Sequence, residues 1–541
     1  MRHTREVVLF ALAIVGCSTP FGTADASDSG QSNAGQGDGR DGGPVISPGP
    51  ENIEFVLAST RLRVVQGQPT KVPIVINRKG MPASDIAITI TGLPQGVTAA
   101  SLTIPSSAST GDLEITVTSD VAQGPIDLTM KGQAASSNAS ASAILSLIVG
   151  GPPGTLDTTF APNGPISDVF GVNSQLINLF VSSDDHIYVL GQCNGAAGSY
   201  SCIARFNSEG VIDNTYGTSG IAWPTDTSSY YSSESSNAAA LLPDGRIILG
   251  TATDNNVAAY SMVSSDGKSS PTTALPICSS AGATASFIQS MAVAPDGNVF
   301  IVFDAGSGMA VAKLASDGSH FDLTFGNGGC ASATFTTPDT HSSSTGIVVR
   351  PEGEIVIVGQ HVVQASVGYG ILQLDKSGAY DTLFGTNGQT TLPIGIMSST
   401  TQNPVLLADG RVVSTIFGYS VYGAIMAIKA DGTGLDTTFG AGSGELWPPY
   451  TSDGMIWNPY VTLDHQDRLL VAGTSDIDQS GHVWRYDDKG APDTSFGTSG
   501  RTEPFPMDGS MGSAIARVQS DGRIVVVSAS NGAVAVSRYW D

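Results

Sequence analysis

The stretch Leu435-Asp436-Thr437-Thr438-Phe439-Gly440 decides the fold, because close variants of it return at a regular interval along the chain. In its copy of the repeat it follows an apolar segment at 404–408, an Asp409-Gly410 turn, and further apolar segments at 411–417 and 423–429. The turn occurs seven times, 52 to 60 residues apart, at Asp185, Gly245, Gly297, Gly353, Gly410, Asp467 and Gly522. The Asp-x-x-aromatic phrase begins at residues 157, 213, 322, 381, 436 and 493. Each copy predicts a four-stranded antiparallel unit.

A four-stranded unit cannot bury both of its faces alone, and a closed ring of such units leaves no long sheet edge. We therefore predict an all-β fold with a seven-bladed β-propeller over residues 154–541. The last copy stops at residues 538–541, where the phrase is due, and the missing phrase stands at 154–160. The ring is predicted to close by pairing of these two segments.

The repeats resemble the delta-60 repeat, a β-propeller repeat of bacterial secreted and surface proteins, over residues 154–541. The second copy departs from the pattern, with Pro271-Thr272-Thr273-Ala274-Leu275 in place of the phrase. The resemblance implies no common enzymatic activity. The repeated Asp is expected to cap its turn and the repeated aromatic to pack between blades.

Residues 51–150 have a different sequence pattern from the repeats. Short alternating stretches such as 71–76, 86–90 and 113–117 are separated by turns with Gly or Pro. This pattern predicts an antiparallel β-sandwich that resembles bacterial immunoglobulin-like domains, without the paired cysteines of antibody domains. Such modules usually space and present other domains, and 150–153 reads as a short hinge.

The N-terminal residues 1–17 have the charge order of a secretory signal, too short to span a bilayer as a helix. They end Ile14-Val15-Gly16-Cys17, which resembles a bacterial lipobox, so Cys17 is the expected lipidation site; the alternative is an ordinary signal with an incidental cysteine. Ser18 favours the outer membrane. Residues 18–50 are rich in Gly, Ser, Asp and Pro and are predicted to be a disordered tether. Membrane contact is expected through the lipid anchor only.

Four further cysteines fit an exported protein. Cys193 and Cys202 flank a Gly-rich loop between two predicted strands, so a hairpin disulfide is expected there. Cys278 and Cys330 occupy corresponding places in consecutive copies and form the second expected pair. The alternative is four buried thiols.

Departures from the repeat are where a ring can carry a binding site. Aromatic residues gather in the segments predicted to form one face of the ring, and they suit a glycan or a protein partner. These residues are Tyr230, Tyr231, Tyr419, Tyr422, Trp447, Tyr450, Trp457 and Tyr460. The alternative is that they cover the mouth of the ring or pack on the sandwich.

A weaker candidate is a partial Ca²⁺ site formed by Asp476, Asp478 and Ser480, whose spacing resembles a calcium-binding loop. The predicted strand at 482–486 places Asp487 too far from the other three residues to complete the Ca²⁺ coordination shell. A polar hairpin tip is the favoured alternative, and no other cofactor is expected.

The formal net charge of −24 repels phosphate backbones, so no nucleic-acid partner is expected. The chain lacks the common metalloprotease, serine-hydrolase and phosphate-loop motifs, and no catalytic residues are assigned. The sequence favours a surface-anchored lipoprotein whose propeller binds a protein or glycan at the cell envelope. The alternatives are a propeller hydrolase or lyase that acts on extracellular polysaccharide and a passive structural component of the envelope.

Overall fold

A computed structural model describes most of the chain from residue 52 to residue 541. The described ranges exclude 57–61, 81–82, 162–165, 172–173, 196–197, 225–237, 253–256, 276–284, 306–307, 336–340, 364–365, 393–398, 401–403, 419–420, 448–455, 476, 506–512 and 531. Over these ranges the fold is all-β apart from a three-residue 3-10 turn at Gly440–Gly442, as predicted. None of the described segments is a helix of membrane-spanning length and apolarity.

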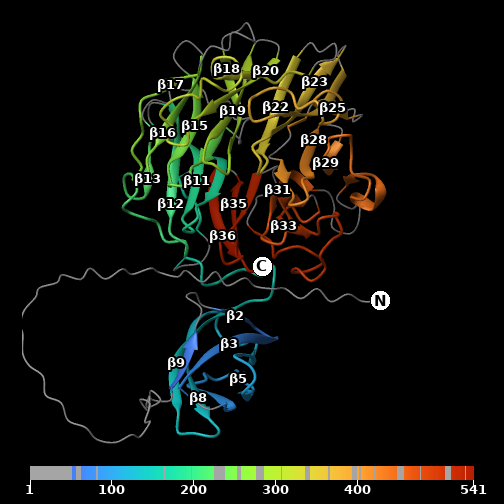
Figure 1. The fold of residues 1–541 in the computed structure, drawn as a ribbon. Helices are drawn as coiled ribbons and strands as arrows, with labels where there is room; N and C mark the ends of the chain where they lie inside the picture. The colour runs from blue at the N-terminus through green and yellow to red at the C-terminus, as the bar shows by residue number, and fades with distance from the viewer. Residues whose placement is uncertain are drawn as a thin grey trace, which may run out of the picture.

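Residues 52–150 form two sheets that enclose one core. The first sheet contains, in spatial order, β1 (Asn52–Val56), β3 (Pro69–Lys79), β7 (Thr110–Val117) and β5 (Val97–Ala99). The second contains β2 (Leu62–Val65), β9 (Ser140–Gly150), β8 (Gly124–Ala134), β4 (Ile86–Thr91) and β6 (Leu102–Ile104). Alternate residues of both sheets, among them Ile74, Leu113 and Leu128, are buried in a cluster confined to this part. We call residues 52–150 the sandwich; Figure 1 shows it in blue, below the larger part of the chain.

The remaining described strands form seven sheets, together called the body. The first sheet contains β10 (Gln175–Val181), β11 (Ile187–Gly195), β12 (Gly198–Phe206) and β13 (Ile221–Ala222), and the second contains β14 (Ala239–Leu241), β15 (Ile247–Ala252), β16 (Ala258–Val263) and β17 (Thr273–Ala274). The third contains β18 (Ala285–Val293), β19 (Val299–Ala305), β20 (Gly308–Leu314) and β21 (Cys330–Ser332), and the fourth contains β22 (His341–Val349), β23 (Ile355–Val363), β24 (Ser366–Leu374) and β25 (Gln389–Leu392). The fifth sheet contains β26 (Ser399–Thr400), β27 (Val405–Leu406), β28 (Val412–Gly418), β29 (Val421–Ile428) and β30 (Glu445–Leu446). The sixth contains β31 (Ile456–Leu463), β32 (Leu469–Ser475) and β33 (Gly481–Tyr486), and the seventh contains β34 (Ser513–Val518), β35 (Ile524–Ser530) and β36 (Ala533–Tyr539).

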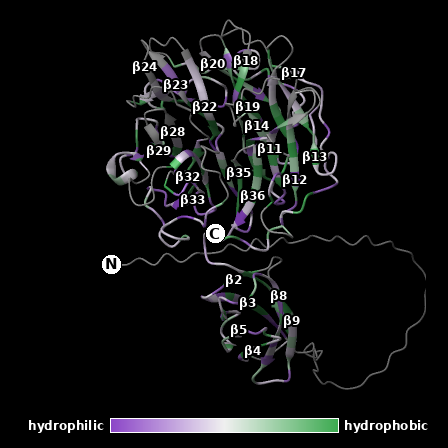
Figure 2. Ribbon diagram, turned by 180° about the vertical axis from the view of Figure 1, so that it is seen from behind, coloured by the Kyte–Doolittle hydropathy of each residue, from purple (hydrophilic) through white to green (hydrophobic). Residues whose placement is uncertain are grey.

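Each body core lies between two sheets rather than inside one. The second and third sheets share a cluster that includes Ile248 and Phe303, and the fifth and sixth share one that includes Val413 and Leu469. The first and seventh sheets also share a cluster, which contains Val189 and Val527. Figure 2 shows hydrophobic residues along many of the strands and hydrophilic ones at many of the turns. A single sheet therefore buries its faces only with its neighbours.

The repeated Asp caps its turn, as predicted. In every copy of the phrase, one carboxylate oxygen accepts a hydrogen bond 2.9–3.1 Å long from the backbone N–H two residues later. The donors are the N–H groups of Thr159, Thr215, Thr324, Leu383, Thr438 and Ser495. The phrase is thus a structural signal.

The repeated aromatic residue packs against a glycine of the next sheet. A Cβ atom at Gly432 would lie 2.3 Å from the ring of Phe384, and one at Gly210 would lie 2.6 Å from the ring of Phe160. Both glycines have positive φ angles, 70° and 77°. In the second sheet, which lacks the phrase, Met262 takes the place of the ring, with its Cε 2.9 Å from a Cβ at Gly318.

The segment predicted at 154–160 pairs with the end of the chain, and Ile166 and Val169 continue the pairing along the last strand, β36. Ile166 and Val536 exchange both backbone hydrogen bonds, at 2.9 and 2.8 Å, and Asp157 N–H donates to the carbonyl of Arg538 at 2.8 Å. The Asp157 carboxylate also forms a 2.7 Å ion pair with Arg538, and both side chains are fully buried. This ion pair joins residues 381 positions apart in sequence.

The sandwich and the body meet at Trp540, where the C-terminus lies in Figure 1. The Gln123 side-chain oxygen accepts hydrogen bonds from Trp540 Nε1 at 3.1 Å and from both the N–H and the hydroxyl of Thr158 at 3.0 Å. The Arg63 guanidinium lies 4.9 Å from the Trp540 ring centroid and donates to the carbonyl of Gly151 at 2.6 Å. The segment predicted to be a hinge is therefore packed against both parts.

Candidate functional site

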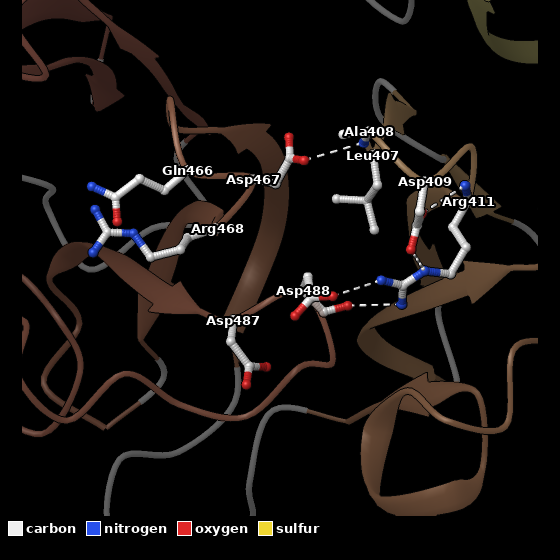
Figure 3. Close-up of a pocket in the computed structure, with 9 residues that line it drawn as sticks. All are labelled: Leu407, Ala408, Asp409, Arg411, Gln466, Asp467, Arg468, Asp487 and Asp488. Atoms are coloured by element: carbon white, nitrogen blue, oxygen red, sulfur yellow. Dashed lines mark hydrogen bonds and ion pairs between the residues drawn. The ribbon is translucent and has the colours of Figure 1, made fainter. Parts of the chain in front are cut away.

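A pocket with a volume of about 390 Å³ opens between the fifth and sixth sheets. Its walls come from the β27–β28 turn, the β31–β32 turn and the turn that follows β33 (Figure 3). The lining residues are Leu407, Ala408, Asp409, Arg411, Gln466, Asp467, Arg468, Asp487 and Asp488. Four carboxylates and two guanidinium groups line this surface.

One wall of the pocket is an Asp-Gly-Arg turn. Asp409 accepts hydrogen bonds from the Arg411 backbone N–H at 3.1 Å and from its Nε at 2.7 Å. The remaining nitrogens of Arg411 reach Asp488 in the next sheet, with its carbonyl and its carboxylate both at 2.8 Å. Burial lowers the pKa of Arg411, but its carboxylate partners outweigh burial and the net pKa is raised. Arg411 is thus a fixed cation that orients the Asp488 carboxylate.

Asp467 stands on the opposite wall, in a conformation that usually requires glycine. Its φ is 58°, and five of the seven turns have glycine at this position. The carboxylate compensates by accepting a 3.2 Å hydrogen bond from the Ala408 N–H of the neighbouring sheet. Asp185, the other exception, accepts a 2.7 Å bond from the Ser520 N–H in the same way.

Arg468 also lines the pocket, and its guanidinium is saturated by carboxylates. It pairs with Asp464 at 2.5 Å and with Asp541 at 2.7 Å. The main-chain oxygen of Asp541 accepts a hydrogen bond from Arg63 of the sandwich at 2.5 Å. The pocket is therefore adjacent to the joint between sandwich and body.

Three carboxylate oxygens of the pocket have no donor among the described residues. Asp467 uses Oδ2, Asp488 uses Oδ2, and Asp487 uses Oδ1 for the N–H groups of Lys489 and Ala491. The second oxygen of each side chain is left to accept a hydrogen bond from a ligand. Within the described ranges no cluster of His, Cys, Asp and Glu has the arrangement that would hold a metal ion. Ammonium, guanidinium and hydroxyl groups match these acceptors.

Of the eight aromatic residues predicted to form a binding face, the structure describes the side chains of Trp447, Trp457 and Tyr460. Tyr460 was expected on an exposed face, but it is fully buried, and its hydroxyl accepts a hydrogen bond from Arg517. Trp457 is half-buried, whereas Trp447 is 39% exposed and donates its indole N–H to Glu445 at 2.9 Å. Tyr230, Tyr231, Tyr419, Tyr450 and the side chain of Tyr422 lie outside the described residues. A second exposed indole, Trp223, occupies the position of the first sheet that corresponds to Trp447.

The possible Ca²⁺ loop is described only in part, because Asp476 lies outside the described residues. The Asp478 carboxylate bonds His482 Nε2 at 3.0 Å and the Ser480 N–H at 3.1 Å. Burial raises the pKa of Asp478, but the hydrogen bonds from His482 and Ser480 outweigh it and the net pKa is lowered. The segment forms the hairpin between β32 and β33.

The predicted hairpin disulfide is confirmed: Cys193 and Cys202 are bonded, with their Cα atoms 6.0 Å apart, across β11 and β12. Cys330, on β21, is buried and also disulfide-bonded. Its expected partner, Cys278, lies outside the described residues, as do Cys17, the signal segment 1–17 and the tether 18–50.

Sequence reasoning missed the pocket. Its residues belong to turns that repeat in every copy, so they were assigned to the scaffold. The available signal was Asp467, which breaks the glycine pattern, together with the adjacent pair Asp487-Asp488.

The sequence matches no known protein family and no curated protein. Among solved structures, it is similar to prolyl oligopeptidase B from Galerina marginata, with 10% identity and a TM-score of 0.28 over 66% of this chain and 56% of that one. The chain thus spans little more than half the length of that enzyme. It is also similar to domains 4–9 of the surface-layer protein SbsC, with 8% identity and a TM-score of 0.14 over 90% of this chain and 81% of that one. Both likenesses are too weak to carry a functional argument.

Proposed function

We propose that the body is a seven-bladed β-propeller of the delta-60 type and that the sandwich is an immunoglobulin-like module. The core clusters support the proposal, since successive sheets share them and the first and seventh sheets share one as well. The backbone hydrogen bonds of Asp157 and Ile166 with β36 support closure of the ring by this N-terminal segment. A ring closed in this way has no long unpaired edge.

We further propose that the protein is a binding protein whose ligand is a protein or glycan that presents amino or guanidinium groups. The acidic pocket between the fifth and sixth sheets carries this proposal, because three carboxylates that line this one cavity each keep an oxygen with no donor among the described residues. A net charge of −24 would also steer a basic partner toward the protein.

The proposed location is the outer membrane of a bacterium, with Cys17 as the lipid anchor. The confirmed Cys193–Cys202 disulfide supports export, because disulfides persist in oxidising compartments. Radiolabelled fatty acid should be incorporated into the full chain in bacterial cells and not into a Cys17→Ala variant. Equal labelling of both would refute the anchor.

Binding to the pocket can be tested with the full chain in detergent and an array of Lys- and Arg-containing peptides, amino sugars and neutral glycans. We expect Asp467→Asn combined with Asp487→Asn to weaken binding of a basic ligand at least tenfold. Asn keeps the positive φ at 467 and the turn bonds at 487 while removing both charges. The matched control is Asp185→Asn with Asp375→Asn, which changes the same turn positions outside the pocket. Equal losses in the two double variants, or binding of neutral ligands only, would contradict the proposal.

A further inference from the structure

Arg468 belongs to the acidic pocket and also to a charge network that reaches the sandwich. It lines the pocket, and its Nη2 donates to Asp541 Oδ1 at 2.7 Å. The same oxygen accepts a hydrogen bond from Arg485, whose side chain is almost completely buried. Burial lowers the pKa of Arg485 and the nearby charge of Arg468 lowers it further, whereas Asp541 opposes both effects. Asp541 therefore lies between two guanidinium groups and neutralises part of both charges.

Asp541 is held in turn by the sandwich. Its main-chain oxygen accepts a 2.5 Å hydrogen bond from Nη1 of Arg63, a residue of β2. The other terminal nitrogen of Arg63 donates to the carbonyl of Gly151 at 2.6 Å, and its guanidinium lies 4.9 Å from the Trp540 ring centroid. Arg63 does not line the pocket. A single residue, Asp541, thus connects the sandwich with the pocket wall.

The position of Asp541 matters for a cation in the pocket. Arg468 is a positive charge in the wall, so it repels an amino or guanidinium ligand unless carboxylates compensate it. Asp464 and Asp541 supply this compensation at 2.5 and 2.7 Å. Asp464 lies four residues from Arg468 in the same turn, whereas Asp541 depends on the joint with the sandwich. A loosened joint frees Asp541 and leaves more of the Arg468 charge to oppose the ligand.

We infer that binding of a cationic ligand in the acidic pocket is coupled to the joint between sandwich and body, with Arg468 and Asp541 as the positioning residues that link them. This inference rests on the proposed binding function and gives the regulation of that same site. Coupling of this kind is reciprocal. An intact joint tightens binding of the cation, and the bound cation stabilises the joint.

The test measures binding of Nα-acetyl-arginine amide and Nα-acetyl-lysine amide to the full chain in detergent, by calorimetric titration at pH 7 and constant ionic strength. We expect Arg63→Gln to weaken binding of at least one probe about fivefold or more. This change removes a positive charge, so an effect of charge alone would tighten the binding of a cation. Weaker binding therefore reports the joint. The matched control, Lys79→Gln, removes the positive charge of an exposed sandwich ion pair and should leave the affinity unchanged.

Gln123→Ala is a second joint variant, and it changes no charge. It removes the oxygen that accepts hydrogen bonds from Thr158 and Trp540, so it decides the inference even if Arg63→Gln folds poorly. We expect it to weaken probe binding as well. The reciprocal effect is measured by hydrogen exchange of the Thr158 N–H, which donates to Gln123 at 3.0 Å. In the wild type this exchange should become slower when the probe is bound.

The outcomes separate the coupling from the proposed function. Wild-type protein that binds neither probe would refute the proposed function, and the coupling would fall with it. Wild-type protein that binds a probe, while both joint variants bind it equally well or more tightly, would overturn the coupling alone. Equal weakening in Lys79→Gln, or exchange at Thr158 that does not respond to the bound probe, would also overturn the coupling.

Discussion

At the scale of single residues, the repeat makes some side chains predictable and hides others. The Asp and aromatic residues of the phrase could be assigned correctly because their partners are local or lie at the same place in the next copy. Asp467 could not, because its acceptor role depends on Ala408, a backbone group 59 residues away. Tyr460 was expected in a connection between copies, but it lies within β31 and is buried. This strand also contains a register shift between Trp457 and Tyr460, where Asn458 has a φ of 48°. Such a bulge exchanges the faces of a strand, and no residue type announces it reliably.

Tyr216 is the one tyrosine among the repeated aromatic residues, and its hydroxyl has no hydrogen-bond partner among the described residues although the side chain is fully buried. Burial raises its pKa. We expect Tyr216→Phe to keep the ring contacts with Tyr188 and Arg205 and to stabilise the protein by about 1 kcal/mol, since an unsatisfied buried polar group is removed. Chemical denaturation measures the change. A loss above about 1 kcal/mol would mean that the hydroxyl has a partner after all.

Substitution of Arg538 tests how much its buried ion pair with Asp157 contributes to stability. Its nitrogens also reach Glu209 at 2.8 Å and Gln519 at 3.1 Å, and its exposure is zero. Arg538→Met leaves the Asp157 charge buried and poorly compensated, so we expect a loss of about 3–5 kcal/mol in unfolding free energy. Lys79→Met, which breaks the exposed pair with Glu54, should cost below about 1 kcal/mol. Similar losses in the two variants would refute this ranking.

At the scale of elements, sequence periodicity located strands well. In the fifth copy, the segments predicted at 404–408, 411–417 and 423–429 correspond to β27, β28 and β29, and the turn falls at Asp409-Gly410 as expected. The short outer strands, such as β30, were less predictable because two residues carry no period. The pocket was not predictable either, since turns far apart in sequence form it only after the sheets have packed.

The Asp-capped turns should make the fold lose stability in acid. Hydrogen bonds from Thr324 and Lys313 lower the pKa of Asp322 to about 2. An unfolded Asp has a pKa near 3.9, so the folded state binds the proton less tightly and the stabilisation is complete above about pH 4. It should decline as the pH falls from about 4 toward 2.

We expect Asp322→Asn to be less stable than the wild type at pH 7. The difference in stability between the two proteins should shrink as the pH falls to 2. Denaturation midpoints measured between pH 2 and pH 7 follow this convergence. Asp112→Asn is the control, because no described residue bonds to the Asp112 carboxylate. A constant difference between wild type and Asp322→Asn across this range would show that the charge of Asp322 contributes nothing.

At the scale of the whole molecule, the ends of the body are joined to each other and to the sandwich by a few residues. The all-β class and the pairing of the segment at 154–160 with the end of the chain could be predicted, because both follow from the count and phase of the repeat. The joint at Trp540 could not, since Gln123, Arg63 and Trp540 belong to segments with no shared pattern. The sequence at 150–153 suggested a hinge, yet a Cβ at Gly150 would lie 3.0 Å from the Trp540 ring.

This joint predicts that the sandwich and the body unfold together. The Gln123 oxygen accepts three hydrogen bonds from two segments of the body, and Arg63 stacks on the indole that supplies one of them. We expect Gln123→Ala with Trp540→Ala to remove these bonds and the stacked ring, and to split one calorimetric transition into two. Gln95→Ala, an exposed change in the same sandwich, should leave one transition at an unchanged temperature. If the double variant still melts in one transition with the wild-type midpoint, the contacts at Trp540 do not couple the two parts, and the 150–153 segment acts as the hinge that its sequence suggests.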